Sequence, residues 1–125
     1  MTSARGFLAL QAVVFSRAAL MHAGVVIHGY EHSAARTAEG IIALVLLIGL
    51  VATVVAPEFS RGIALGAQGF ALLGTAVGLF TIAIGVGPRT ALDLTLHGAM
   101  VVLLVIGLVV VGRRPRMLES RRARQ

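Results

Sequence analysis

Four long apolar stretches limit the fold of this chain more than any other feature of its sequence. A helix needs about 20 mostly apolar residues to cross about 30 Å of hydrocarbon. Four segments reach that length, and they predict membrane-spanning helices over residues 6–27, 37–56, 62–85 and 91–111. Pro57 and Pro88 follow the second and third of these segments, where a helix has to end. We therefore expect an all-α integral membrane four-helix bundle that forms one unit over residues 1–112.

The composition indicates that lipid is part of the solvent around this chain. Hydrophobic residues make up 58% of the sequence and charged residues 13%, whereas a soluble domain has about 25% charged residues. The sequence contains no cysteine, which excludes disulfides, thiolate metal sites and cysteine nucleophiles.

Positive charge gathers after the last apolar stretch and indicates the orientation of the bundle. The net charge is +6, and six arginines lie at the C-terminal end of the sequence: Arg113, Arg114, Arg116, Arg121, Arg122 and Arg124. Arginines beside a span favour the cytoplasmic side. We expect an arginine-rich cytoplasmic tail over residues 113–125, both termini in the cytoplasm, and a multi-pass protein of a bacterial-type cell membrane. No aromatic or structured basic face accompanies this charge, so we expect no nucleic-acid partner.

The first predicted helix carries several polar residues that a membrane span does not normally contain. At about 100° per residue, Gln11, Arg17 and His22 fall on one half of this helix, and Phe15 falls on the half that we expect to face lipid. A charged side chain inside a span is costly and needs a partner. Gln68 of the third helix lies at a depth similar to that of Arg17, so we predict that both are intramembrane polar sites.

Two histidines on different helices form a candidate cofactor site. His22 and His97 each lie about five residues from the predicted outer end of a helix, roughly 7–8 Å into the outer leaflet. Histidines facing each other inside a bundle can bind haem iron or another metal ion, and haem b or a divalent metal is the cofactor that we consider. Asp93 lies four residues before His97 and can orient its imidazole. Alternatively, Asp93 only caps the fourth helix and His97 only satisfies a backbone carbonyl.

A second candidate metal site lies between the first two helices. The segment from His28 to His32 reads H-G-Y-E-H, which matches the H-x-x-E-H pattern of inverted zinc peptidases. The match lies at a membrane exit and contains a helix-weakening glycine, so simple metal binding by His28 and His32 with Glu39 is the better hypothesis. The alternative is a hydrated loop with weak local ion pairs.

Three functions remain open on these observations. The leading prediction is a non-catalytic structural or accessory subunit, acting as a homo-oligomer or in a larger membrane complex. The alternative is an electron-transfer subunit that uses His22 and His97. A small dimeric transporter is a third possibility, because the length and helix count are similar to those of small multidrug-resistance exporters. Those exporters use a glutamate embedded in the first helix, whereas this chain carries Arg17 and His22 there.

Overall fold

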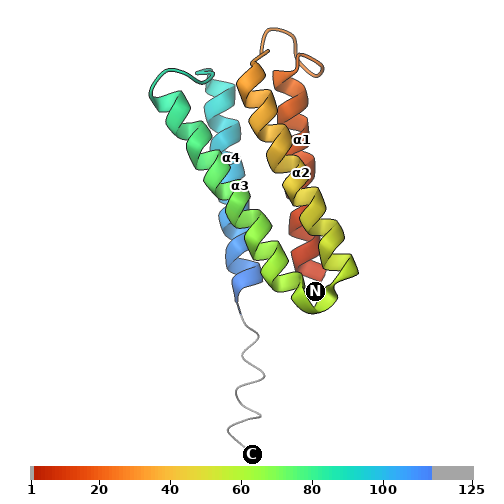
Figure 1. Cartoon of the computed structure of the whole chain (residues 1–125). Helices are drawn as coiled ribbons and strands as arrows, with labels where there is room; N and C mark the ends of the chain where they lie inside the picture. Colours follow the sequence, from red (N-terminus) through yellow and green to blue (C-terminus); the bar gives the residue numbers. More distant parts are fainter. Residues whose placement is uncertain (1, 114–125) are drawn as a thin grey trace, which may run out of the picture.

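The computed structural model describes residues 2–113 and consists of a four-helix bundle. Its helices are α1 (Thr2–His22), α2 (Ser33–Val55), α3 (Ser60–Ala83) and α4 (Ala91–Gly112), with a short 3-10 helix, η1 (Pro57–Phe59), before α3. The helices run alternately up and down (Figure 1). We call the end with the α1–α2 and α3–α4 loops the upper end, and the end with the α2–α3 turn the lower end.

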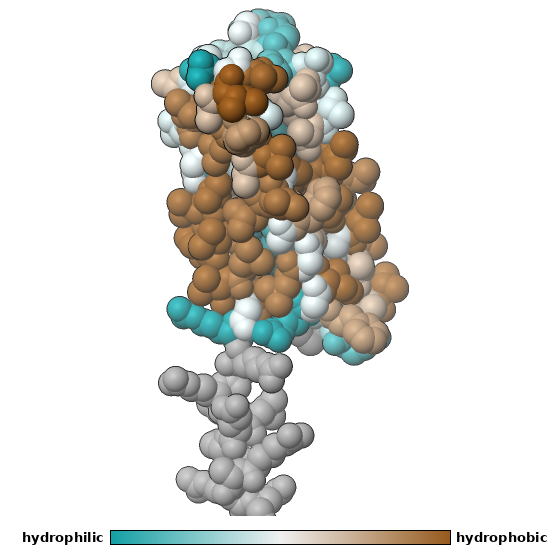
Figure 2. All heavy atoms as spheres, turned by 60° about the vertical axis from the view of Figure 1, so that its left-hand side comes forward, coloured by the Kyte–Doolittle hydropathy of each residue, from teal (hydrophilic) through white to brown (hydrophobic). Residues whose placement is uncertain are grey.

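All four long helices are long and apolar enough to cross a membrane, as the sequence predicts. Figure 2 shows a broad apolar belt between two more hydrophilic ends. The helix α2 contributes large exposed apolar side chains to this surface, among them Ile41, Leu44 and Ile48. These features suggest a multi-pass membrane protein. The predicted arginine-rich tail lies, beyond Arg113, outside the described residues.

The first helix differs most from the prediction. We expected it over residues 6–27, but α1 begins at Thr2 and ends at His22. Gly24 follows with a φ of +74°, a left-handed conformation that glycine adopts readily at the end of a helix. The imidazole of His32 then caps α2, because its Nδ1 accepts a hydrogen bond from the Ala35 N–H at 3.2 Å. Residues 23–32 therefore form a loop, and α2 starts four residues earlier than predicted.

The buried face of α1 also differs from the prediction. Phe15, which we expected to face lipid, is 1% exposed and belongs to the core together with Leu8 and Ala12. Arg17, expected inside the bundle, is exposed on the helix surface. The correct inner face combines large apolar residues with a few polar ones, so polarity alone does not identify it.

Three arginines satisfy carbonyl groups at the C-terminal ends of helices. Arg5 donates to Thr53 O of α2 at 2.6 Å, Arg61 to Val111 O of α4 at 3.2 Å, and Arg89 to Ile82 O of α3 at 3.0 Å. The last carbonyls of a helix have no partner within the helix and carry partial negative charge. These contacts therefore stabilise helix ends, with Arg5 and Arg61 acting at the lower end of the bundle.

Candidate functional site

A buried cluster of three ionisable side chains connects three helices at the upper end of the bundle. His22 Nδ1 lies 2.7 Å from Glu39 Oε2, and His22 Nε2 lies 3.1 Å from Asp93 Oδ1. The three residues come from α1, α2 and α4 and are at most 4% exposed. Buried ionisable groups in a membrane bundle are costly and are normally functional or paired. We call this set the Glu–His–Asp cluster.

The two contacts of His22 set the smallest number of protons that the Glu–His–Asp cluster can hold. Each nitrogen–oxygen contact needs one hydrogen, and a neutral imidazole supplies only one. The second proton therefore resides either on the imidazole, which is then an imidazolium, or on one carboxyl group. With these two protons the cluster carries a single negative charge in both arrangements, because two carboxylates and one imidazole then hold one proton more than a neutral imidazole.

Local structure fixes Asp93 in this position. Thr90 is the N-cap of α4: its hydroxyl accepts a hydrogen bond from the Asp93 N–H, and Asp93 Oδ2 accepts one from the Thr90 N–H, each at 3.1 Å. This is the capping box that the sequence predicts as one role of Asp93. Because Oδ2 is held by the cap, Oδ1 points to His22. Asp93 therefore serves the helix end and the cluster at once.

His97 lies one turn further into the bundle than Asp93. Its Nδ1–H donates to the backbone carbonyl of Asp93 at 2.8 Å. This is the bond to a backbone carbonyl that was expected from the sequence as the alternative, and the Asp93 carboxylate does not orient the imidazole. In this tautomer Nε2 is an acceptor. It points toward α3 at Gly78, where a Cβ atom would lie only 3.2 Å away. Gly78 therefore makes room for the imidazole.

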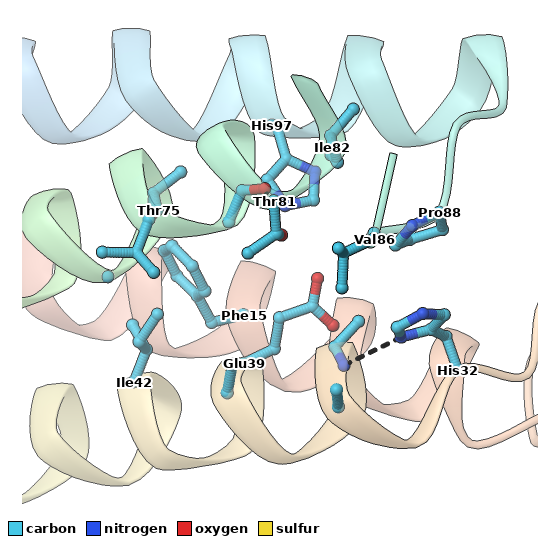
Figure 3. A pocket seen from close by; sticks show the side chains of 17 residues that line it. Phe15, His32, Glu39, Ile42, Thr75, Thr81, Ile82, Val86, Pro88 and His97 are labelled. Carbon is cyan, nitrogen blue, oxygen red and sulfur yellow. Dashed lines mark hydrogen bonds between the residues drawn. The ribbon is translucent and has the colours of Figure 1, made fainter. Parts of the chain in front are cut away.

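A cavity of about 200 Å³ lies beside the cluster, between α2 and α3 and bounded by His97 of α4. Glu39 and His97 project toward it from opposite sides (Figure 3). The Oε1 atom of Glu39 is buried and makes no hydrogen bond, although a buried acceptor normally has a partner. This oxygen is the feature of the site that most needs an explanation.

The two histidines of the haem hypothesis differ in how many of their ring nitrogens are already hydrogen-bonded. Both ring nitrogens of His22 already contact carboxylates, so ligation of iron by His22 requires one of these contacts to break. His97 keeps Nε2 available. The prediction that His22 and His97 bind haem or a metal ion is not tested by this geometry and stays a prediction.

The three residues of the second candidate metal site differ in exposure and in hydrogen-bond partners. The side chain of His28 is 94% exposed, His32 caps α2, and Glu39 is buried against His22. Within residues 2–113, no three His, Asp or Glu side chains are arranged so that they could hold a metal ion. The sequence did not predict the pairing of Glu39 with His22. The signal was present, because Glu39 is the acidic residue of the second apolar stretch and lies near the same membrane face as His22.

A second buried polar contact lies near the middle of the bundle. Gln11 Nε2 donates to Gln68 Oε1 at 2.9 Å, and Gln68 Nε2 donates to Ala64 O of its own helix at 3.1 Å. Gly107 of α4 packs so closely that a Cβ atom there would meet both amides. The partner of Gln68 is therefore Gln11, and Arg17 lies elsewhere on the exposed surface of α1.

Comparisons with known proteins do not place this chain in a family. No protein-family model matches it, and neither do any curated proteins or solved structures.

Proposed function

We propose that this chain is a non-catalytic protein of the cell membrane that binds a small molecule in the cavity between α2 and α3. It acts as a homo-oligomer or as an accessory subunit of a larger membrane assembly. The observation that carries this proposal is Glu39 Oε1, a buried carboxylate oxygen without a partner on a side chain that lines a cavity. A bound molecule that donates a hydrogen bond would satisfy this oxygen.

The side chains around the cavity favour binding over catalysis. The hydroxyl of Thr75 donates to Ala71 O and that of Thr81 to Gly78 O, each within α3. Neither hydroxyl is directed to a general base, as an activated nucleophile has to be. The other carboxylate oxygen of Glu39 is held by His22. The arrangement therefore holds Glu39 in place as a binding group, and neither threonine hydroxyl of the cavity is activated as a nucleophile.

Native mass spectrometry of protein purified in mild detergent tests this proposal. We expect a small-molecule adduct on the wild-type chain, and we expect Ala38→Phe to abolish it because Ala38 lines the cavity. Ala76→Phe is the matched control, since Ala76 is an exposed alanine of α3 that does not line the cavity. Equal adducts on all three proteins, or none on the wild type, would contradict the proposal.

We further propose that the lower end of the bundle faces the cytoplasm. The start of α1 and the end of α4 lie at this end (Figure 1), where Arg5, Arg61 and Arg113 gather, and arginine near a span favours the cytoplasmic side. The chain has no cysteine, so single cysteines can be introduced without background. A membrane-impermeable maleimide added to intact cells should label Gly29→Cys in the upper loop and spare Glu58→Cys in the lower turn. The opposite pattern would invert the topology.

A further inference from the structure

We infer that the cavity binds a protonated amine with an apolar body, whose ammonium group donates to Glu39 Oε1 and His97 Nε2. This inference rests on the proposed function and specifies its ligand. It follows from the size of the cavity, from the hydrogen-bonding state of each polar group that lines it, and from the charge of the Glu–His–Asp cluster.

Small residues on two helices create the space. Ala34, Ala35 and Ala38 line it from α2, and Gly74 and Gly78 line it from α3. A dry cavity of about 150 Å³ holds a benzene ring, and this cavity measures about 200 Å³. A ring or short alkyl chain with one polar group fits this volume.

The polar side chains deep in the cavity offer acceptors and no free donor. The hydroxyl hydrogens of Thr75 and Thr81 are used on carbonyls of α3, and the Nδ1–H of His97 is used on Asp93 O. The remaining sites are Glu39 Oε1, which has no partner, and His97 Nε2, which is an acceptor in this tautomer. A ligand that is itself an acceptor therefore gains nothing here, whereas an ammonium group has several N–H donors.

His32 is the exception among the lining side chains. Its Nδ1 accepts from the Ala35 N–H, so a neutral ring carries its hydrogen on Nε2. His32 lies at the loop side of the cavity, and Figure 3 shows its ring away from Thr75 and Ile42. This donor can interact with solvent or with the outer part of a ligand, so it does not change the acceptor character of the interior.

Charge selects a cation over a neutral donor. With the two protons that its contacts need, the Glu–His–Asp cluster carries one negative charge, and neither arginine nor lysine lines the cavity among the described residues. A charge-assisted hydrogen bond in a low-dielectric site is stronger than a neutral one. A metal cation fits less well, because it prefers several oxygen or nitrogen ligands and residues 2–113 provide no group of three.

A ligand series on the wild-type protein tests the inference without depending on any variant. Benzylamine, cyclohexylmethylamine and hexylamine are compared with the corresponding alcohols and carboxylates, using calorimetry on protein in mild detergent. We expect at least one amine to bind about tenfold or more tightly than its alcohol, the factor expected for a charge-assisted contact. The carboxylates should not bind.

Two variants assign the binding to the named groups. Glu39→Gln keeps the size of the side chain and removes its charge, so we expect the preference for amine over alcohol to disappear. Ala38→Phe fills the cavity and should abolish binding of both, whereas Ala76→Phe should change neither. Zn²⁺ alone should neither bind nor compete with the amine.

The outcomes separate this inference from the proposed function. Alcohols that bind as well as amines, or a preference that survives Glu39→Gln, would refute the amine and leave a binding cavity. Tight Zn²⁺ binding that Glu39→Gln removes would assign the site to a metal instead. If none of the ligands binds and no adduct is found on the purified chain, both the inference and the proposed function fail.

Discussion

The bundle contains two buried polar clusters that are built from the same helix and are opposite in character. Gln11 and His22 are eleven residues apart in α1, which is about three turns, so they lie on one face. The Gln11–Gln68 pair is neutral and is packed tightly against Gly107. The Glu–His–Asp cluster is charged and borders a cavity. A membrane bundle can therefore use buried polar groups in one layer to hold helices together and in another to prepare a site.

Packing distinguishes the two clusters more clearly than hydrogen bonding does. Each cluster has one buried acceptor without a partner, Gln11 Oε1 in one and Glu39 Oε1 in the other. The Gln11–Gln68 pair is packed directly against Gly107, where a Cβ atom would overlap Gln68 Oε1 and Gln11 Nε2. Near Glu39 there is a cavity. Only the second acceptor belongs to a side chain that lines the cavity.

The largest effect is expected from removing the centre of the charged cluster. His22→Ala leaves two buried carboxyl groups without their shared partner, and breaking a buried ion pair costs about 3–5 kcal/mol. Unfolding by sodium dodecyl sulfate in mixed micelles measures this loss. His28→Ala is the control, because the His28 side chain is 94% exposed and should give no measurable change. If the two variants are equally stable, the cluster does not hold the upper end together.

A smaller loss of stability is expected from crowding the neutral pair. Gly107→Ala places a methyl group where both amides lie, and overpacking with a disrupted buried hydrogen bond costs about 1–3 kcal/mol. Gly98→Ala is the matched control on α4, since nothing lies within 4 Å of its Cβ position. The same micelle titration compares them. An equal loss of stability in both variants would show that alanine destabilises α4 in general, and that the Gln11–Gln68 pair is not the cause.

The smallest effect is expected when both glutamines are replaced together. Gln11→Leu alone leaves Gln68 Oε1 without its donor, and Gln68→Leu alone leaves Gln11 Nε2 with only its longer contact to Leu103 O. We expect each to cost about 1–3 kcal/mol. The double variant removes both partners, so its loss of stability should be smaller than the sum of the losses in the two single variants. His22→Leu with Glu39→Leu should show no such relief, because Asp93 stays buried with its charge unpaired. Additive losses for the glutamines would show that the two amides act independently.

The sequence predicted the number and type of the helices because long apolar stretches determine them almost alone. It predicted the end of α1 incorrectly, since the apolar run Val25–Ile27 continues past the glycine at which the helix stops. Depth along a helix can be counted from the sequence, and His22, Glu39 and Asp93 were therefore all expected near one face. Which side chains meet depends on how the helices rotate and pack, and α1 turns Phe15 inward and Arg17 outward. The pairing of His22 with Glu39 required that information.

The pairing of His22 with Glu39 has a consequence for the order in which the helices enter the bilayer. α1 and α2 are consecutive, so a histidine and a glutamate 2.7 Å apart can meet as soon as the first hairpin is complete. An imidazolium and a carboxylate together are neutral, which lowers the cost of bringing each into hydrocarbon. Asp93 belongs to the last helix and arrives when the hairpin already offers a hydrogen-bond donor. The charged pair of the first hairpin can therefore form before α3 and α4 are present, whereas Gln11 of α1 finds its partner Gln68 only when α3 has been added.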